Sequence, residues 1–568
     1  MKKCEQLRIK YIYFFFISLF VILSTRIGYL QVFKKKFFSS LAQSQYYRLI
    51  PLKGKRGKIL DCKGRILANG INSHSIFADP SLIGNLDETV EVISSKLALS
   101  KKELKSKLQK KKRFVWIKRK VSWKESEEIK LLKLNGIMSI REEKRFYPQE
   151  NLSFSILGIV DIDNKGLGGL ELSYDTYLQG KDGLVRVLQD ASGETIFTPL
   201  VVIPAEGADI ILTIDSQIQY WTENYLEETI KKFSAKKGSV VVMNAHTGGI
   251  LALADYPSVN PNQRDEIFFG SMKNCAIADY FEPGSVFKVV TLLAAVGENK
   301  FSDEDIIWCE KGKFKIPGTI LHDWKPYGEL SFKDVFKKSS NIGVAKIVSS
   351  LGKTILYRYI KKLGFGEKTG VDLPGESAGV VKLPHKWSKT SKFIIPIGQE
   401  IGVNLLQLTR LFAVVANGGY LVKPHIVRNI RSQGFSKEIA QDKKRVVSSS
   451  VAQRVKNILI EVVEEGTGKL ARIPGVKVGG KTGTAQKYDP KIKKYSPTKY
   501  RASFIGFIDD YRQPLVIGVT IDEPMKSHFG GVVAAPLFKE IAQKVVDYLD
   551  MDVQVAEKQE HKTTQLGH

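Results

Sequence analysis

The stretch that decides the fold is Tyr280–Val290, which reads YFEPGSVFKVV. Pro283 and Gly284 interrupt regular structure, and a largely apolar run over residues 286–296 follows them. This pattern predicts a turn that leads into a buried helix, with Ser285 in the first helical turn.

Ser285 and Lys288 are three residues apart, so they share one face of the predicted helix. A serine hydroxyl is a weak nucleophile until a base removes its proton, and burial in an apolar wall lowers the pKa of a lysine enough for it to be that base. The N–H groups at the start of a helix can also stabilise charge on an attacked carbonyl. A second Ser-x-x-Lys, from Ser234 to Lys237, runs straight into a strand-like segment, and we attribute it to chance.

A second motif, Ser339-Ser340-Asn341, follows a short helix predicted at residues 332–338. A hydroxyl and a carboxamide two residues apart can relay a proton and bind an amide carbonyl. The same Ser-x-Asn pattern occurs at residues 258–260, in a loop bracketed by prolines, so this motif is weak by itself.

The third motif is Lys481-Thr482-Gly483, which Thr484 follows on a predicted edge strand. A cation and a hydroxyl there can bind a terminal carboxylate, and Gly483 lets the strand approach an acyl group closely. Another Lys-Thr-Gly, at residues 368–370, lies in a glycine-rich loop with no strand pair after it. The three motifs in this order and in these contexts predict an active site built around a nucleophilic serine.

The chain has 568 residues, 43% of them hydrophobic, and a formal net charge of +28. This length predicts two or three domains with a sizeable core. The charge would suit nucleic acid, anionic lipid or an anionic wall polymer, but we interpret it mainly as solvated lysine-rich faces. No zinc-finger or RNA-binding signature is present, which argues against nucleic acid as a partner.

Residues 101–120 form a strongly basic segment, with eleven basic residues and one acidic residue. They predict a solvated helix that leads into a strand. Contact with lipid or with partner proteins is the alternative.

The cysteines are scattered at Cys4, Cys62, Cys275 and Cys309, without a Cys-x-x-Cys or a histidine cluster nearby. They predict neither a metal site nor a disulfide framework. The redox state of the last three is left open.

The N-terminal segment predicts a membrane anchor at residues 11–33, preceded by a cytoplasmic tail at residues 1–10. Arg26 falls near the outer end of the span, where a long side chain can reach the interface. A cleaved signal peptide is the alternative, but no small-x-small cleavage site follows the apolar run. Basic residues flank both ends almost equally, so the expected orientation rests on the shortness of the tail.

The rest of the chain predicts an α+β protein. Residues 34–205 read as a mixed α/β region without a chemical constellation, and residues 206–550 as helices packed on one antiparallel sheet. The polar residues 551–568 are expected to be disordered. The expected elements are a strand–turn–strand over 56–68, helices at 170–178, 218–232 and 532–549, a hairpin of 238–244 with 250–254, and a meander of 476–485, 502–508 and 514–521.

The three motifs are those of penicillin-binding proteins and serine β-lactamases, and the chain resembles a class B penicillin-binding protein over nearly its whole length. Residues 479–485 (GGKTGTA), 145–148 (RFYP) and 168–171 (GGLE) carry this resemblance outside the serine motif. Residues 162–167 and 323–341 are more similar to the septal, FtsI-type branch than to the elongation branch. One departure is Asp61-Cys62-Lys63-Gly64, where relatives carry Arg-Asn before the glycine.

The resemblance implies a D,D-transpeptidase that acts on stem peptides ending in D-Ala-D-Ala. Ser285 would attack the penultimate carbonyl with Lys288 as base, and Ser339 would pass a proton to the leaving D-Ala. The remaining implied roles are peptide-backbone binding by Asn341, carboxylate binding by Lys481 and Thr482 beside Gly483, and an oxyanion hole from the N–H groups of Ser285 and Thr484.

The family also implies partners and a location. β-Lactams would acylate the same serine, and a separate membrane glycosyltransferase of the FtsW (SEDS) type would work with this chain among the division proteins. No cofactor or metal is implied. The protein would be a single-pass protein of the inner (cytoplasmic) membrane, with its bulk outside the cytoplasm.

Other functions fit the sequence less well. A β-lactamase is disfavoured because no Glu-x-x-Leu-Asn lies between the second and third motifs, and a β-lactam sensor because ten residues leave no room for a cytoplasmic signalling domain. A glycosyltransferase domain is disfavoured because residues 34–205 lack a Glu-Asp-x-x-Phe signature. An elongation-type transpeptidase, a D,D-carboxypeptidase and a catalytically idle division scaffold remain as alternatives.

Overall fold

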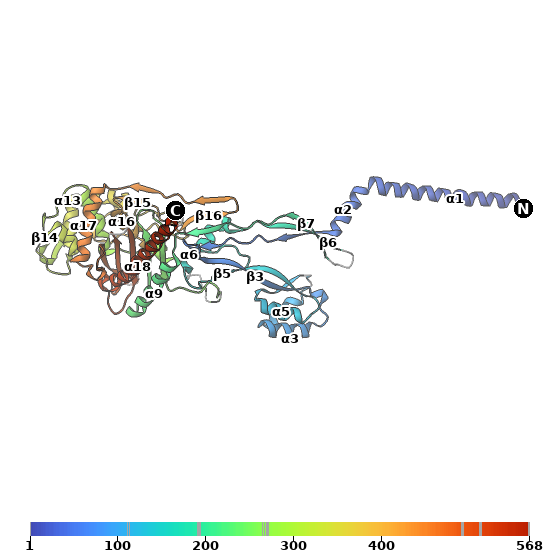
Figure 1. The fold of residues 1–568 in the computed structure, drawn as a ribbon, viewed down its shortest axis with the longest axis horizontal. Helices are drawn as coiled ribbons and strands as arrows, with labels where there is room; N and C mark the ends of the chain where they lie inside the picture. Colours follow the sequence, from blue (N-terminus) through green and yellow to red (C-terminus); the bar gives the residue numbers. More distant parts are fainter. Residues whose placement is uncertain are drawn as a thin grey trace. The chain divides into compact units, whose positions relative to one another are not determined.

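The computed structural model describes residues 2–110, 112, 114–189, 195–263, 265, 267, 272–489, 494–509 and 514–565. They form two compact units, which Figure 1 draws as one ribbon. Unit 1 comprises residues 1–55 and 179–207, and unit 2 comprises residues 56–178 and 208–568.

Unit 1 contains the N-terminal helix. Helix α1 (Lys2–Gly28) runs into a π-helical turn, η1 (Tyr29–Phe33), and α2 (Lys35–Tyr46) follows. Residues 5–33 form one continuous apolar helix that is long enough to cross a membrane, with a mean hydropathy of 1.8, and none of its most apolar window is buried by the rest of the protein. An antiparallel sheet of β1 (Tyr47–Leu52), β6 (Gly183–Gln189) and β7 (Thr195–Val202) completes this unit.

Unit 2 begins with a long twisted sheet. Its strands run in the order β17-β16-β8-β2-β3-β4, and β5 pairs with β3 on the edge opposite to β4. The strand–turn–strand expected near residue 60 is confirmed, because β2 (Ile59–Leu60) pairs antiparallel with β3 (Ile66–Ala78). Three helices, α3 (Leu86–Leu97), α4 (Lys101–Leu108) and α5 (Trp123–Leu131), enclose a small apolar core with β3, β4 (Val115–Val121) and β5 (Ile137–Phe146). The predicted helix-to-strand step in residues 101–120 is therefore confirmed.

A buried ion cluster ties this region together. The Glu171 carboxylate is 2.7 Å from the guanidinium of Arg56 and 2.6 Å from that of Arg145, and all three side chains are at most 2% exposed. Arg56 also pairs with Asp175 at 2.7 Å, and Arg145 donates to the carbonyl oxygen of Gly57. The Glu171 carboxylate is therefore the shared partner of two buried guanidiniums.

We expect Glu171→Ala to destabilise unit 2 strongly, because it would leave the buried Arg145 without a carboxylate partner and Arg56 with Asp175 alone. Removing one partner of a buried ion pair costs about 3–5 kcal/mol. The urea midpoint followed by circular dichroism measures the loss. Glu127→Ala is the matched control, since Glu127 pairs only with the exposed Lys130 and should change stability by less than about 1 kcal/mol. Equal midpoints for the two variants would contradict the expectation.

The second sheet of unit 2 has five antiparallel strands in the order β10-β9-β21-β20-β19. Helices α9 (Ser216–Phe233) and α18 (Gly530–Gln565) pack on one face, and α16 (Leu405–Ala416) packs on the other. The predicted hairpin is confirmed as β9 (Lys237–Asn244) with β10 (Ile250–Tyr256). The predicted meander is confirmed as β19 (Val478–Asp489), β20 (Lys494–Ile508) and β21 (Leu515–Asp522). The strand β19 is an edge strand, as expected.

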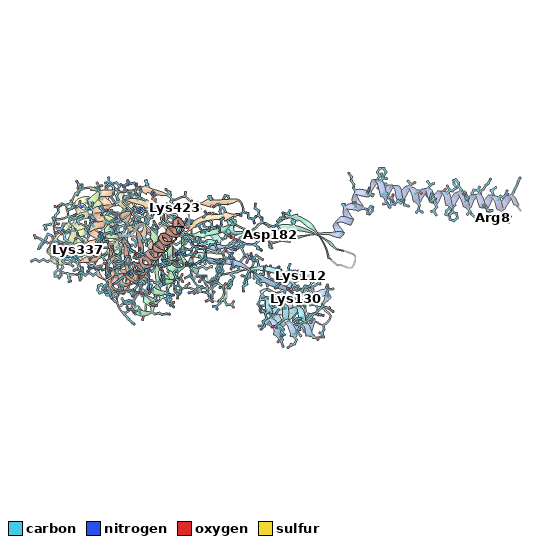
Figure 2. All side chains as sticks on the ribbon, viewed as in Figure 1. Arg8, Lys112, Lys130, Asp182, Lys337 and Lys423 are labelled. Carbon is cyan, nitrogen blue, oxygen red and sulfur yellow. The ribbon has the colours of Figure 1, made fainter. Side chains whose placement is uncertain are left out.

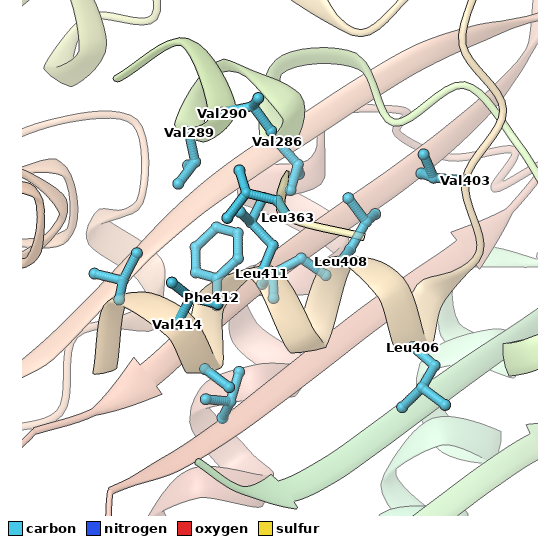
Figure 3. Close-up of a cluster of buried hydrophobic side chains, with 14 of the residues drawn as sticks. Val286, Val289, Val290, Leu363, Val403, Leu406, Leu408, Leu411, Phe412 and Val414 are labelled. Carbon is cyan, nitrogen blue, oxygen red and sulfur yellow. The ribbon is translucent and has the colours of Figure 1, made fainter. Parts of the chain in front are cut away.

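The helix that follows Ser285 lies in the core of this unit. The turn η4 (Gly284–Phe287) leads into α11 (Lys288–Gly297), of which nine residues, 288–296, are buried. Figure 3 shows apolar side chains of η4 and α11 facing those of α16 in one cluster. Lys288, at the start of this apolar helix, is itself fully buried.

Three elements differ from the sequence prediction. Ser285 lies in a 3₁₀ turn before the α-helix, and the helix expected over 170–178 is broken at Tyr174 into α7 (Gly169–Ser173) and α8 (Asp175–Leu178). The structure also continues α18 to Gln565, where disorder was expected after Asp550. Residues 551–565 contain neither Gly nor Pro and include the strong helix formers Ala, Glu, Lys and Gln, which an expectation based on polarity alone overlooks.

The remaining elements are η2 (Pro80–Leu82), α6 (Phe154–Leu157), β8 (Asp209–Leu212), α10 (Cys275–Ala278), β11 (Ile306–Trp308), η5 (Glu310–Gly312), β12 (Lys313–Ile316), β13 (Thr319–His322), β14 (Glu329–Ser331), α12 (Phe332–Lys337), α13 (Asn341–Leu351), α14 (Lys353–Lys362), η6 (Pro384–Lys386), α15 (Ser391–Ile394), η7 (Ile395–Ile397), β15 (Tyr420–Val422), β16 (Val427–Ser432), β17 (Phe435–Glu438), β18 (Lys443–Arg445), α17 (Ser449–Glu464) and η8 (Lys469–Ala471).

Candidate active site

The turn that carries Ser285 is fixed by two glycines. Gly284 has a φ of +55°, a conformation that favours glycine, and its N–H donates to the carbonyl oxygen of Gly398 at 3.1 Å. A Cβ on Gly398 would lie 2.1 Å from the carbonyl oxygen of Gly284, so only glycine allows this approach. Ser285 is half-buried between buried neighbours. Its hydroxyl has no hydrogen-bond partner among the described residues.

The Lys288 amine points into the second motif. Its Nζ lies 2.6 Å from the carbonyl oxygen of Ser339, 2.7 Å from Oδ1 of Asn341 and 3.2 Å from Oγ of Ser339. Burial, and next the nearby charge of Lys481, lower the pKa of Lys288 well below its usual value. A neutral amine has two N–H groups, which the carbonyl and the carboxamide oxygens accept, and its lone pair is left to take a proton from a hydroxyl.

The second motif is held by an acidic residue that sequence reasoning missed. Ser339 has a φ of +59°, and Ser340 caps α13 by accepting the N–H of Gly343. Asp323 accepts the N–H of Asn341 at 2.5 Å and the hydroxyl of Ser340 at 2.6 Å. A carboxylate at a helix N-terminus is stabilised by the helix N–H groups, so Asp323 clamps the loop that faces Lys288.

The third motif closes the arrangement from β19. Lys481 is 1% exposed, and its Nζ donates to Oγ of Ser339 at 2.9 Å. Burial lowers the pKa of Lys481 to about 7. A Cβ on Gly483 would lie 2.8 Å from Cγ2 of Val286 and 2.9 Å from the carbonyl oxygen of Pro283, so glycine is what lets β19 lie against the serine turn.

The remaining predicted residues lie on the same strand. Thr482 donates its hydroxyl to that of Thr467 at 3.1 Å, and Oγ1 of Thr484 accepts the N–H of Gly530 at 3.1 Å. The Gly530 segment also brings a ring stack that the motifs did not predict, in which His528 lies 4.2 Å from Tyr500, centroid to centroid. No sequence pattern marked Tyr500 or His528, because Tyr500 lies on β20 and His528 reaches it from the loop before α18 only in the folded chain.

Three motifs separated by up to 200 residues thus meet in one place in the fold. The hydroxyl of Ser339 is the common neighbour of two buried amines, Lys288 and Lys481. The other copies of the motifs have different structural roles. Ser234 ends α9 in the left-handed conformation, and Thr369 donates to the buried carboxylate of Glu376 in its loop. The arrangement suits nucleophilic attack by a serine whose proton passes to a neutral lysine.

Metal chemistry is not suggested by the part of the chain that the structure describes. It contains no group of three or more His, Cys, Asp or Glu side chains placed to hold a metal ion. Cys62, Cys275 and Cys309 are free thiols, each separate from the others.

Comparison with protein families gives two matches. Residues 238–543 match the penicillin-binding protein transpeptidase domain, and residues 51–212 match the penicillin-binding protein dimerisation domain. The chain belongs to the penicillin-binding protein family. The transpeptidase match contains all three motifs of the cleft.

Curated relatives agree along nearly the whole length. The transpeptidase is 32% identical to the probable peptidoglycan D,D-transpeptidase PbpC of Pseudomonas aeruginosa, with 94% of each chain covered. It is 33% identical to the stage V sporulation protein D of Bacillus subtilis, over 94% of this chain and 84% of the relative. It is 31% identical to the peptidoglycan D,D-transpeptidase FtsI of Buchnera aphidicola, with 93% of each covered.

Solved structures agree as well. The transpeptidase superposes on a peptidoglycan synthetase from Bifidobacterium adolescentis with a TM-score of 0.71 and 25% identity, over 89% of this chain and 97% of that one. Penicillin-binding protein 3 of Mycobacterium tuberculosis, solved with aztreonam, gives 0.70 and 28%, over 88% and 97%.

The family prediction is therefore confirmed. The protein is a peptidoglycan D,D-transpeptidase of the class B penicillin-binding type, with a mixed α/β fold. Its one described apolar helix of spanning length lies at the N-terminus, which gives a membrane-anchored protein with a large soluble part. Two family matches that leave the first 50 residues uncovered agree with this layout.

Proposed function

We propose that this transpeptidase cross-links stem peptides during septum formation through an acyl-enzyme on Ser285. The observation that carries the proposal is the convergence of Lys288, Ser339 and Lys481 by direct hydrogen bonds beside the Ser285 turn. We propose the following domain boundaries together with this function. Residues 11–33 are the anchor, 34–205 a non-catalytic pedestal and 206–550 the catalytic domain, with tails at 1–10 and 551–568.

Acylation follows from the geometry of the cleft. Oγ of Ser285 attacks the carbonyl carbon of the penultimate D-Ala, and its proton passes to Nζ of Lys288. The N–H groups of Ser285 and Thr484 stabilise the oxyanion. The C–N bond then breaks, and the departing D-Ala amine receives the proton through Oγ of Ser339, which neighbours both lysines.

Substrate binding uses the other predicted residues. Lys481 and Thr482 bind the terminal carboxylate, and Gly483 lets the substrate lie against β19. Asn341 holds the peptide backbone with its carboxamide, whose Nδ2 donates to the carbonyl oxygen of His322 at 2.8 Å in the structure. That bond is exchanged for one to substrate. The amine of a second stem peptide then attacks the acyl-enzyme and restores the Ser285 hydroxyl.

The pH dependence of acylation tests the two lysines together. Lys288 acts as base only without its proton, so kcat/KM rises with pH through its lowered pKa. Lys481 binds carboxylate only with its proton, so kcat/KM falls again above about pH 7, the pKa of Lys481 in the free protein. We expect a bell-shaped profile for acylation by a fluorescent penicillin, measured by stopped flow. A rate that keeps rising from pH 6 to pH 9 would contradict the role of Lys481.

Asp323 gives a second test away from the reacting atoms. Asp323→Asn keeps the shape but loses the charge that clamps the loop before α13. Hydrogen bonds to a charged group contribute about 1.5–3 kcal/mol, so the acylation rate constant should fall by roughly 10- to 100-fold. The Kd of the initial penicillin complex should rise less than the rate constant falls, because Lys481 and Thr482, which bind the carboxylate, do not contact Asp323. Glu304→Gln, which removes an exposed pair with Lys333, is the control. An unchanged rate would contradict the clamp.

Septal action is supported by the FtsI relative and by the resemblance of residues 162–167 and 323–341 to that branch. The proposed partners are D-Ala-D-Ala stem peptides, β-lactams, an FtsW-type glycosyltransferase and other division proteins. β-Lactam binding draws support from the M. tuberculosis relative solved with aztreonam. The proposed location is the cytoplasmic membrane, with the catalytic domain outside.

Depletion followed by microscopy separates the branches. Septal action predicts filaments, whereas rounded cells would assign the protein to elongation. Product analysis with and without an amine acceptor separates a transpeptidase, which forms cross-linked dimers, from a carboxypeptidase, which releases only D-Ala. An idle scaffold would form neither product and would not be labelled by penicillin.

A further inference from the structure

One sheet in unit 2 is apolar on both faces, although only one face is covered. The strands β4, β3 and β5 contribute Ile76, Ala78 and Ile117 to the core under α3, α4 and α5. Because side chains alternate along a strand, the residues between them point to the opposite face. There an antiparallel sheet exposed to water normally carries polar residues.

The opposite face instead carries aromatic and aliphatic side chains. We call it the aromatic face, and it comprises Phe77, Phe114, Trp116, Met138 and Ile140. The ring of Phe114 lies 4.7 Å from that of Phe77 and 4.8 Å from that of Trp116, centroid to centroid. Phe114, Met138 and Ile140 remain 47%, 40% and 46% exposed. An apolar patch of this kind on a soluble domain marks an interaction site.

The strand β5 at the border of this face has an edge that no described strand covers, although Asn164 donates to the carbonyl oxygen of Glu143 near the far end of the strand. It pairs with β3 along all ten of its residues, and no other described strand pairs with it. Figure 1 shows β3 and β5 running into the part of unit 2 that carries α3 and α5. Every second residue of such an edge directs its N–H and C=O groups outward, where an added strand can bond to them.

The segment that builds this sheet and its covering helices is strongly basic, although several of its lysines, such as Lys96, Lys118 and Lys130, are paired with carboxylates. Residues 96–145 hold 18 basic and six acidic residues, a large share of the chain's net charge. Figure 2 labels Lys112 and Lys130 in this part of the chain. Arg119 stacks on Trp116 and is already paired with Glu142, whereas Lys144, further along β5, has no ion-pair partner among the described residues. Charge repulsion of this size disfavours a second copy of the chain on the same face.

We propose that the aromatic face and the edge of β5 bind an extended, acidic segment of a partner protein outside the membrane. The segment adds a strand to β5, places alternate apolar side chains over Met138 and Ile140, and directs carboxylates to the surrounding lysines. The proposal concerns residues remote from the cleft motifs in sequence and chemistry, and it holds whichever branch of wall synthesis the protein serves.

A peptide probe tests the binding chemistry on the full chain in detergent. The probe is a fluorescein-labelled ten-residue peptide that alternates valine and glutamate. We expect a Kd of about 100 μM or tighter in low salt, by anisotropy, and binding at least about 10-fold weaker in 0.5 M NaCl, since salt screens exposed charges. The double substitution Met138→Glu with Ile140→Glu should weaken it at least about 10-fold. Leu131→Glu is the control, because Leu131 is exposed at the end of α5, on the helix-covered side.

Three results would overturn the proposal. They are no binding of the glutamate peptide at 1 mM, equal binding of a valine–lysine peptide, and equal binding to the double variant. Self-association that the double substitution abolishes would assign the face to a second copy and overturn it as well. A glutamate peptide with two central prolines should not bind, because proline removes the N–H groups that pair with an edge.

A complementation experiment tests whether cells need the aromatic face. In cells depleted of the native protein, the Leu131→Glu chain should restore growth, and the Met138→Glu/Ile140→Glu chain should not. Both variants should be labelled by fluorescent penicillin as the native chain is, so a failure of the docking proposal stays distinct from a failure of the catalytic one. Full rescue by the double variant would overturn the docking proposal.

Discussion

Ser285→Ala is expected to abolish acylation by penicillin and cross-linking of stem peptides. The methyl group cannot attack a carbonyl, and nothing else in the described cleft replaces the nucleophile. Removing the nucleophile of a serine hydrolase costs on the order of 10⁶ in rate. Fluorescent-penicillin labelling of the full chain in detergent, resolved on a gel, measures the loss.

The fold should survive this change. Ser285 is half-buried and its hydroxyl has no hydrogen-bond partner among the described residues, so the free energy of unfolding should move by less than about 1 kcal/mol. Ser234→Ala is the matched control, because Ser234 begins the other Ser-x-x-Lys and lies exposed at the end of α9. It should label normally. Persistent labelling of the Ser285→Ala chain would mean that another residue is the nucleophile.

Lys288→Met is expected to slow acylation by roughly 10²- to 10⁴-fold, the contribution that a positioned general base makes. Methionine fills the same space but cannot accept the proton of Ser285. It also leaves the carbonyl oxygen of Ser339 and Oδ1 of Asn341 without their shared donor. The residual acylation rate should no longer rise with pH on the acid side of the profile, because the amine whose deprotonation causes that rise is absent.

Two measurements keep this result interpretable. Stopped-flow acylation separates the rate constant, which should fall, from the Kd of the initial complex, which should stay within about threefold because Lys481 and Thr482 are intact. Lys236→Met, at an exposed lysine of the chance motif, should behave as the native chain does. A Lys288→Met chain that acylates at the native rate would show that another group takes the proton.

The parts of the fold that the sequence predicts well are those with a strong local signal. Apolar runs in the sequence indicated the strands β9, β10, β20 and β21 of the five-stranded sheet. The turn-forming residues Pro283 and Gly284 indicated the start of the helix after Ser285. Motif order and context favoured the Ser-x-x-Lys at Ser285 over its copy, because the copy at Ser234 is followed by a strand and not by a helix.

The parts that it missed depend on contacts between distant segments. Asp323 precedes the second motif by many residues, and no periodicity links it to the N–H groups that it accepts. The stack of Tyr500 on His528 arises where the loop before α18 returns to β20. Ser285 lies in a 3₁₀ turn because Gly284 is held by Gly398, a contact that no local pattern contains. The uncovered aromatic face likewise becomes visible only once β4 and β5 are placed on either side of β3.

The measurement that tests the central claim most directly is the location of the penicillin adduct in the native chain. The full-length protein is acylated with benzylpenicillin, digested at low pH and analysed by tandem mass spectrometry. The account predicts one penicilloyl group, on the hydroxyl of Ser285. An adduct on another serine, such as Ser339 or Ser234, or intact protein that carries no adduct, would contradict it.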